Sequence, residues 1–360
     1  MQKKQLGLSL IELMIAITLG LVLMTGVVQM FLSSKVIFST QQGMSRIQET
    51  GRLAIEFLSR DVRMAAYYGC HRPVPPTPTN PSTSADLQNK NLVIAGLHGN
   101  FGEGIRGYDN ITNLPGGQSD VGAGLTLLGA DKTAHVLVVR SASEVGFPIS
   151  AANNANNVIA YSANPLVDGC AEGICVNSAV VVSDCYKARV FQATNVSLAG
   201  TTLTLQHADS WGGGSVFLEN FTSGEVLPMN TTVYFLAEGA SGAPSLWQKT
   251  NSEEALELLE GVEHMRITYA IIDNVEPGID LIPDNYKLAS AVTAAEWPYV
   301  ASIRLELVVR SLDNNVLDDT QPFTFAGATI TPADIDGVKD RHMRQVFTAT
   351  VSVRSRAVLQ

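Results

Sequence analysis

The sequence predicts an α+β protein in which one long N-terminal helix packs on an antiparallel β-sheet head with long loops. Three observations predict this class. Residues 8–32 form an apolar segment of transmembrane length, and residues 33–68 continue it as an amphipathic helix. In residues 69–360, short β-like segments alternate with stretches rich in glycine, asparagine and serine, as expected for an extracytoplasmic β-rich head.

Composition limits the class of protein. A chain of 360 residues with 46% hydrophobic and 16% charged residues has enough apolar side chains for a folded core, which excludes a disordered protein. The net charge is −10 and no lysine or arginine cluster offsets it, so we expect no nucleic-acid partner. All four cysteines follow the apolar segment, and an even number there suits an oxidising compartment such as a periplasm.

The apolar segment is long enough to cross a bilayer. Residues 8–32 include 18 apolar side chains and a single charge, that of Glu12. As a helix they span about 37 Å, more than the roughly 30 Å of a hydrocarbon core. Lys3 and Lys4 precede the segment, so the positive-inside rule predicts a cytoplasmic N-terminus and an external head.

Three interpretations compete for this segment. A secretory signal peptide has a shorter apolar core and a small-residue cleavage site, and residues 33–38 offer no such site. A plain signal anchor explains the length but not the acid. The third interpretation, that the segment assembles with others like it, has to explain Glu12.

Glu12 is costly inside an apolar helix. An acidic side chain there costs about 2.5–3.5 kcal/mol on insertion scales, so such residues usually have a function. Cleavage between Gly7 and Leu8 makes Glu12 the fifth residue of the mature chain, one helical turn from a new amino group. Among staggered parallel helices, Glu12 can then pair with the N-terminal ammonium of a neighbour, which removes two unpaired charges.

This N-terminus resembles the class III signal of type IV pilins and pseudopilins. The resemblance implies that residues 1–7 are a cytoplasmic leader, that Leu8 becomes an N-methylated N-terminus, and that Glu12 acts in assembly. It also implies processing by a prepilin peptidase and N-methyltransferase. The family usually has phenylalanine at the position of Leu8.

The amphipathic segment predicts that the helix continues from Leu8 to about Tyr68. Residues 39–66 contain no proline, and apolar or small residues recur there at intervals of three and four: Met44, Ile47, Gly51, Ala54, Leu58, Val62 and Ala65. The first half of the helix is apolar all round and needs lipid or other helices. The second half is apolar on one face and needs a sheet to cover it.

The rest of the chain predicts mainly strands. We expect them at Leu92–Leu97, His135–Arg140, Ala179–Ser183, Thr201–His207, Thr231–Ala237, His264–Ile272, Ile303–Arg310 and Val346–Arg354. One short helix is expected at Glu253–Leu259 with Ser252 as its N-cap. The stretches Gly99–Gly124 and Ala151–Asn157 are predicted to be surface loops.

Segments beyond the signal are similar to PilW-type minor pilins. They are Gly51–Cys70, Ser183–Cys185 with Phe191–Thr194, and Leu259–Glu263 leading into Met265–Tyr269, the last also similar to the J-type pseudopilin of type II secretion. The resemblance implies a low-abundance subunit that primes pilus assembly and lies at or near the filament tip. Its implied partners are other minor and major pilins, the inner-membrane assembly platform and a tip adhesin. A head of roughly 290 residues is also too bulky to repeat throughout a thin filament.

The cysteines predict disulfides rather than a metal site. Cys170 and Cys175 are five residues apart with no further cysteine or histidine close by, which favours a local bridge and leaves Cys70 to pair with Cys185. Four cysteines allow three connectivities, and the sequence does not choose among them.

No motif predicts an enzyme, a metal or a cofactor. Residues 313–319 are rich in aspartate and asparagine but lack the glycine and terminal glutamate of a calcium loop, so a polar turn is expected. The six histidines are scattered and no nucleophile motif is present. A type IV pilus minor pilin is the favoured function. The alternatives are a type II secretion pseudopilin and, more remotely, a membrane-anchored periplasmic binding protein or enzyme.

Overall fold

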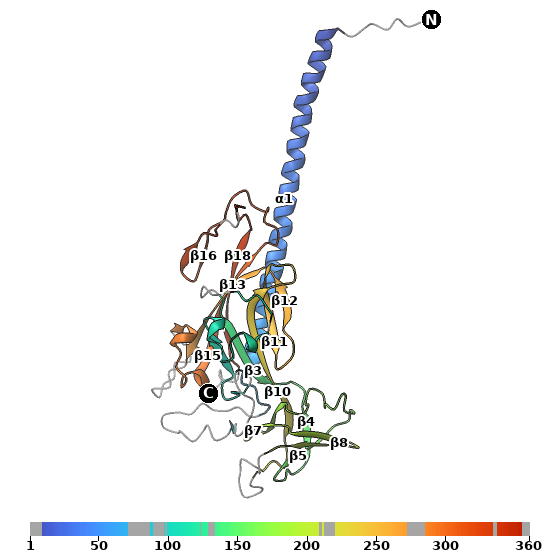
Figure 1. Ribbon diagram of the computed structural model, residues 1–360, viewed down its shortest axis with the longest axis vertical. Helices are drawn as coiled ribbons and strands as arrows, with labels where there is room; N and C mark the ends of the chain where they lie inside the picture. The colour runs from blue at the N-terminus through green and yellow to red at the C-terminus, as the bar shows by residue number, and fades with distance from the viewer. Residues whose placement is uncertain are drawn as a thin grey trace, which may run out of the picture.

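The computed structural model is dominated by one long helix that projects from a β-rich head (Figure 1). It describes residues 9–70, 87–88, 97, 99–122, 124–128, 134–208, 211, 220–271, 285–333 and 337–354. The helix, α1, spans Leu10–Met64, and only its C-terminal part lies along the head. This is the predicted class, a long apolar helix with a large, mostly antiparallel sheet domain.

The C-terminal half of α1 packs by the predicted amphipathic repeat. The buried residues of the helix are Ile47, Gly51, Ala54, Leu58, Ser59 and Val62, which form one stripe. Met44 is an exception, because its side chain is 41% exposed. The stripe covers the face of the sheet formed by β15 and β18.

The helix ends four residues earlier than the expected Tyr68. Ala66 has φ of 58°, which a helix cannot accommodate. Its backbone N–H donates to the carbonyl oxygen of Arg140 at 2.9 Å, so the chain leaves the helix to join a strand of the head. A tertiary hydrogen bond therefore sets the helix end, and no local sequence signal does.

A four-stranded antiparallel sheet lies against α1. Its order is β14-β13-β15-β18, with bounds Tyr286–Lys287, Val262–Ile271, Val300–Arg310 and Arg344–Ser352. The largest apolar cluster in the described part of the chain lies between this sheet and the helix stripe, and includes Ile267, Leu305 and Val351. Next to it, the hairpin of β16 (Phe323–Phe325) and β17 (Ala328–Ile330) packs on Val308 and Val346.

A second, branched sheet builds the rest of the head. Its main path is β1-β7-β6-β10-β4-β5-β9-β8, with β2, β3, β11 and β12 branching from β10 and its neighbours, and β1 and β7 are its parallel pair. The bounds are β1 Leu87–Gln88, β2 Ile105–Tyr108, β3 Val136–Ala142, β4 Phe147–Ala151, β5 Asn157–Tyr161, β6 Ala179–Asp184, β7 Lys187–Gln192, β8 Asn195–Ala199, β9 Thr202–Gln206, β10 Glu225–Glu238, β11 Pro244–Thr250 and β12 Leu256–Glu260.

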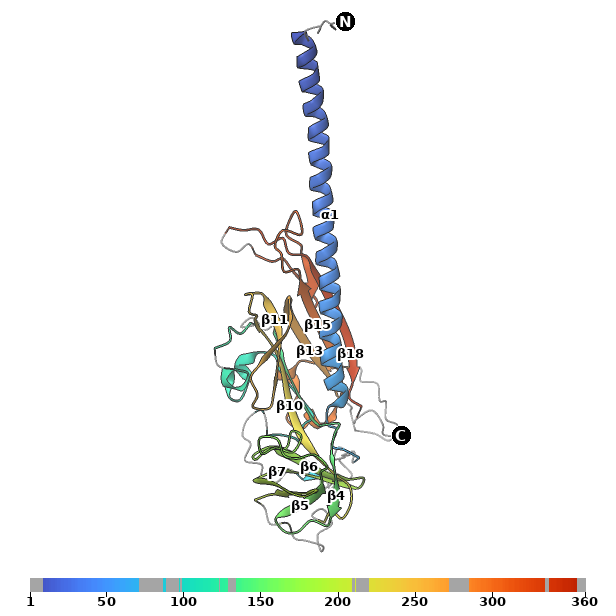
Figure 2. The same ribbon diagram turned by 90° about the vertical axis from the view of Figure 1, so that its right-hand side faces the viewer.

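Strand β10 links the two ends of the head. Its first residues pair with β6 and β4, and its later residues pair with β3 and β11. The lobe formed by β4 to β9 consequently lies beyond the C-terminal end of α1 (Figure 2). The head therefore extends past the C-terminal end of the helix.

The strands predicted between His135 and Arg354 are confirmed, with ends shifted by a few residues. The strand expected at Leu92–Leu97 lies mostly outside the described residues. The loop Ala151–Asn157 connects β4 to β5 and has its end residues in those strands.

Two of the predictions for the head are wrong. Glu253–Leu259 is not a helix, because Asn251 turns the chain at φ of 50° and Leu256–Glu260 pairs with β11 as β12. Gly99–Gly124 is not a plain surface loop. It contains β2 and two short 3₁₀ helices, η3 (Ile111–Asn113) and η4 (Gly117–Asp120), and its Phe101 and Val121 are buried.

Two disulfides cross-link the head. Cys70 is bonded to Cys185 across 115 residues, which ties the chain leaving α1 to the turn between β6 and β7. Cys170 is bonded to Cys175 in a local loop. The long-range bridge restricts the position of the distal lobe relative to the end of the helix.

We predict that Gly51→Leu lowers the free energy of unfolding by about 1–3 kcal/mol, the usual range for overpacking. A Cβ at position 51 lies 2.3 Å from the ring of Phe347, so a larger side chain there forces the helix away from β18. Gly43→Ala is the control, because its Cβ lies 3.4 Å from Val316. Chemical denaturation of both full-length variants in detergent measures the difference. Equal stability of Gly51→Leu and wild type contradicts close packing at this point.

Candidate assembly site: the apolar helix and its junction with the head

The N-terminal half of α1 has no partner in its own chain. None of the most apolar 18-residue window of the helix is buried, and the helix is long and apolar enough to cross a membrane. Its exposed apolar side chains run without interruption along the helix and include Leu10, Ile15, Leu21, Val27, Phe31 and Phe38.

Two hydroxyl groups of this half are satisfied within the helix. The hydroxyls of Thr18 and Thr25 donate to the carbonyl oxygens of Ile15 and Leu21 at 2.9 and 2.8 Å. Such back-bonding removes the need for water, which a hydrocarbon environment does not supply. Glu12 is the single charge of the segment.

Glu12 lies in the first turn of α1 and its side chain is exposed. Leu13 N–H donates to the carbonyl oxygen of Ser9 at 3.1 Å, so the helix begins immediately after Ser9. Within the residues that the structure describes, the Glu12 carboxylate has no hydrogen-bond or ion-pair partner. Gly7 and Leu8, the expected cleavage and methylation residues, lie outside the described residues. The carboxylate is therefore open to a group from another chain.

A half-buried acid, Asp61, anchors the other end of α1. Tyr234 of β10 donates its hydroxyl to the Asp61 carboxylate at 2.8 Å, and Gln248 Nε2 donates to the Tyr234 oxygen at 3.2 Å. Burial raises the pKa of Asp61 above its usual range, although the Tyr234 hydrogen bond and the charge of Arg60 oppose the shift. This contact fixes the last turns of the helix to the centre of the head.

A buried arginine holds the segment that follows the helix. Arg140 of β3 donates to the carbonyl oxygen of Leu97 from Nη2 at 2.6 Å and to that of Glu103 from Nη1 at 3.0 Å. Burial lowers the pKa of Arg140, and Glu103 partly opposes that shift. Tyr68 donates its hydroxyl to the carbonyl oxygen of Phe101. Together these bonds connect the exit of α1 to the loop before β2.

An ion network fixes the start of β18. Arg344, whose side chain is fully buried, donates to Glu263 at 2.6 and 3.0 Å and to Asp340 at 2.8 and 2.7 Å. Burial raises the pKa values of both acids, but the hydrogen bonds and charge of Arg344 lower them below their usual range. Arg310 adds to the effect on Glu263 at 3.4 Å. The network holds the loop before β18 against β13.

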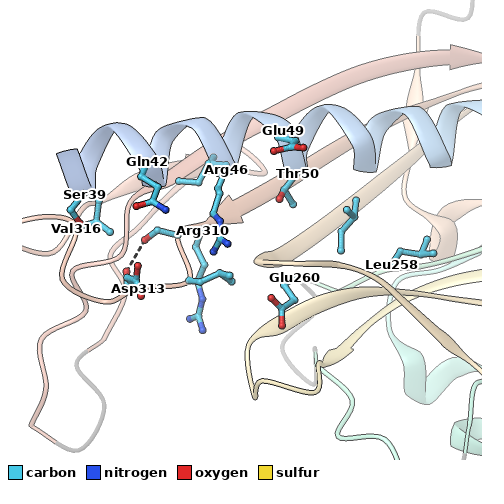
Figure 3. A pocket seen from close by; sticks show the side chains of 15 residues that line it. Ser39, Gln42, Arg46, Glu49, Thr50, Leu258, Glu260, Arg310, Asp313 and Val316 are labelled. Carbon is cyan, nitrogen blue, oxygen red and sulfur yellow. Dashed lines mark hydrogen bonds between the residues drawn. The ribbon is translucent and has the colours of Figure 1, made fainter. Parts of the chain in front are cut away.

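A polar groove of about 360 Å³ lies where α1 emerges from the head (Figure 3). Arg46 extends into it from α1 and Arg310 from the end of β15, with Glu260 at the end of β12 and Asp313 on the loop after β15. Both signs of charge are present. In the described part of the chain, no group of three or more histidine, cysteine, aspartate or glutamate side chains could hold a metal ion.

Two protein-family models match the chain, one over the start of the apolar helix and one over the head. A model described as a prokaryotic N-terminal methylation motif matches residues 2–28, which contain Gly7, Leu8 and Glu12. A model described as type IV pilus-assembly protein W, PilW, matches residues 233–355, which contain the sheet that packs on α1. Together the two matches support a type IV pilus minor pilin of the PilW family. The motif and the exposed apolar helix of this pilin indicate a membrane-anchored protein that is processed as a prepilin and contacts other pilins.

Comparison with solved structures gives a type IV-like pilin from Thermus thermophilus. That chain is 18% identical, the match covers 51% of this pilin and 86% of that chain, and the TM-score is 0.22. A search of curated protein sequences gave no match.

The contacts at the junction of α1 and the head could not be predicted from the sequence. Asp61 and Tyr234 are 173 positions apart, and no local pattern connects them. Arg140 is a charge at the end of the apolar run His135–Arg140, and that position was the one sequence signal for its burial. Arg344 has no such signal, because Glu263 lies 81 positions away.

We predict that the acid sensitivity of this pilin changes when Arg344 is replaced. Glu263 and Asp340 have lowered folded-state pKa values, so their contribution is present above their unfolded pKa values of about 4 and is lost as the pH falls through the folded values. Arg344→Gln removes the main partner of both acids, with only Arg310 still at 3.4 Å from Glu263, and destabilises the protein by about 3 kcal/mol at pH 7. As the pH falls through these lowered folded values, the two acids become protonated in the wild type as well, and the difference from wild type shrinks.

Unfolding of the full-length protein in detergent between pH 7 and pH 3 measures this effect. Lys339→Gln is the control, because the Lys339–Asp319 pair is exposed and its loss leaves stability unchanged. A difference between Arg344→Gln and wild type that stays constant over the whole range contradicts the prediction.

Proposed function

We propose that this pilin primes assembly of a type IV pilus and is located at or near the filament tip. It enters the filament through α1, with Glu12 paired to the N-terminal ammonium of a neighbouring subunit. One observation supports this most directly. The apolar part of α1 up to Leu32 is exposed, and its single charge, Glu12, lies at the first turn with no partner in the described chain.

Processing creates the partner group. A prepilin peptidase and N-methyltransferase cuts after Gly7 and methylates the amino group of Leu8, which remains positively charged. In a bundle of parallel helices, a small axial shift brings Glu12 of one subunit to this ammonium of the next. A pair of opposite charges avoids the cost of leaving either one alone in an apolar environment. The pair thereby favours one axial register.

The proposed topology is a single pass through the bacterial inner membrane. The leader, with Lys3 and Lys4, stays in the cytoplasm, and the head lies in the periplasm until the assembly platform moves the subunit into the pilus. The two disulfides of the head are consistent with an oxidising compartment.

The shape of the head supports a terminal position. The lobe of β4 to β9 extends beyond the C-terminal end of α1, away from the membrane end of the helix (Figures 1 and 2). Inside a filament, the next subunit toward the tip lies on that side. A subunit at the tip has no neighbour on that side, so this lobe meets none. It is free to contact a tip adhesin. The proposed role is structural and not enzymatic, with no cofactor.

Two alternatives remain distinguishable. A type II secretion pseudopilin of the J type uses the same helix chemistry, but the PilW match favours the pilus. Deletion of the gene then reduces pilus number and twitching, and leaves type II secretion intact. A membrane-anchored periplasmic binding protein or enzyme keeps Met1 and Lys3 after synthesis, whereas the proposed pilin begins at methyl-Leu8.

We predict that Gly7→Phe blocks cleavage while membrane insertion continues. The peptidase has to accept the residue before the cut, and a bulky side chain there fills the space of the glycine. Mass spectrometry of the N-terminus and membrane fractionation measure the two steps. Gln2→Ala in the same leader is the control and is cut normally. Normal processing of Gly7→Phe contradicts the assigned cleavage site.

We predict that Glu12→Val is cleaved and inserted but is depleted from sheared pili by at least about tenfold, because the neighbouring ammonium loses its counter-charge. Quantitative immunoblotting of pili and membranes, with pilus counts and a twitching assay, measures the effect. Gln29→Val, an equally conservative change in the same segment, keeps incorporation normal. Wild-type levels of Glu12→Val in pili exclude the role proposed for the carboxylate.

A further inference from the structure

Strand β18 forms an open edge of the sheet that packs on α1. Among the described residues it pairs only with β15. Two bonds extend the ladder beyond its ends, from Ser311 N to Met343 O and from Val353 N to Ala301 O, each 2.8 Å long. Given the register of the pair, the odd-numbered residues of β18 direct their backbone groups toward β15. The even-numbered residues therefore direct theirs outward.

The outward backbone groups are available along most of the strand. At its start, Arg344 N–H donates to the side-chain oxygen of Gln321 at 2.9 Å, which closes that end. Further along, Thr348, Thr350 and Ser352 have exposed side chains, and their outward N–H groups have no partner in the described part of the chain. Figure 2 shows β18 at the border of the sheet, next to α1.

The edge lacks the features that normally prevent strand addition. Residues 345–353 contain no charge, proline or glycine, and the pairing of β15 with β18 has no register shift. Natural proteins protect open edges with charges, prolines, bulges or short strands. Most of the other described edges are shorter or carry charges. β12 contains Glu257 and Glu260 and pairs through a bulge, β8 has five residues, and β1 and β14 have two each.

We propose that β18 receives a strand from the head of a second, different pilin of the same filament, which pairs with it antiparallel. Backbone hydrogen bonds at such an edge give affinity without requiring special side chains. The interface includes Thr348, Thr350 and Ser352 and adjoins α1, the element that meets neighbouring subunits in the proposed filament.

Orientation argues against a second copy of this chain. β18 runs in the same direction as α1, because Ser311 and Val316, next to the start of β18, lie at Gly43, while Phe347 lies at Gly51. Antiparallel pairing of two β18 strands therefore points two α1 helices in opposite directions. Helices anchored in one membrane cannot adopt that arrangement, a step that rests on the proposed function.

The opposite edge strand of the sheet, β14, cannot supply the added strand in a second copy of this chain either. In a laterally shifted copy, β14 faces β18 with antiparallel direction, but it pairs over only two residues. Its Lys287 is bound to Glu296 at 2.7 Å. The partner is therefore a pilin with a longer edge strand.

Thr350→Pro tests the edge directly. Proline removes the outward N–H of residue 350, and the ladder with β15 does not use that group. Thr350→Ala keeps the N–H and is the matched control. Each epitope-tagged full-length protein is expressed in the native host, its membranes are solubilised, and the co-purifying pilins are quantified by mass spectrometry. A second, differently tagged copy is expressed in the same cells.

Thr350→Pro is expected to reduce the recovery of one other pilin by at least about tenfold, and Thr350→Ala by less than about twofold. Equal recovery with Thr350→Pro and wild type overturns the edge interface and leaves the pilin function intact. If wild type recovers no pilin at all, the proposed function itself fails. Recovery of only the second tagged copy overturns the assignment to a different pilin.

A photocrosslinking amino acid gives a result that does not depend on tolerance of proline. Placed at Thr348, benzophenone-phenylalanine is expected to form an adduct with the same pilin in intact cells. Placed at Ser197, an exposed residue of the distal edge strand β8, it forms none. Absence of a pilin adduct at Thr348, in cells where the wild type recovers pilins, overturns the proposal.

Discussion

The structure depends on an apolar surface that the chain cannot bury by itself. Side chains from Leu10 to Phe38 are exposed along the projecting half of α1, and each square ångström of such surface costs about 25 cal/mol in water. Lipid or other helices have to cover it. The helix therefore has two stable environments, the membrane and a bundle of similar helices, and the proposed function moves it from the first to the second.

The head holds this helix at a fixed angle. Gly51 allows the ring of Phe347 to approach the helix axis, Asp61 is bonded to Tyr234, and Arg140 closes the exit beyond Ala66. These contacts lie on one side of the helix and along its last half. Because they involve both sheets, a shift of the helix disturbs the whole head. The position of the head in a filament then follows from the position of the helix.

Periodic features could be predicted from the sequence, and tertiary ones could not. The stripe through Ile47, Ala54 and Leu58 repeats at helical spacing, so both the helix and its buried face were predictable. Residues 253–259 contain leucines and glutamates that suit either a helix or an edge strand, and pairing with β11 decides between them. In residues 99–124 the glycines obscured Phe101 and Val121, whose burial depends on strands far along the chain. The importance of Glu12 could be predicted because it is the single charge in an apolar segment, which the local sequence shows directly. Asp61 and Arg344 were not, because each lies in an ordinary polar context and meets its partner only after folding.

The Glu12–ammonium pair and the strand addition at β18 differ in how selectively they recognise a neighbouring subunit. Pairing of Glu12 with an N-terminal ammonium is open to every processed subunit that has an acid at the fifth mature position, and apolar helices pack on one another with little selectivity. That contact sets the axial register but cannot choose the neighbour. A minor pilin that acts at one place in the filament needs a further contact that excludes most subunits. An uncharged open edge such as β18 supplies it, because strand addition requires matching length, direction and twist in the partner.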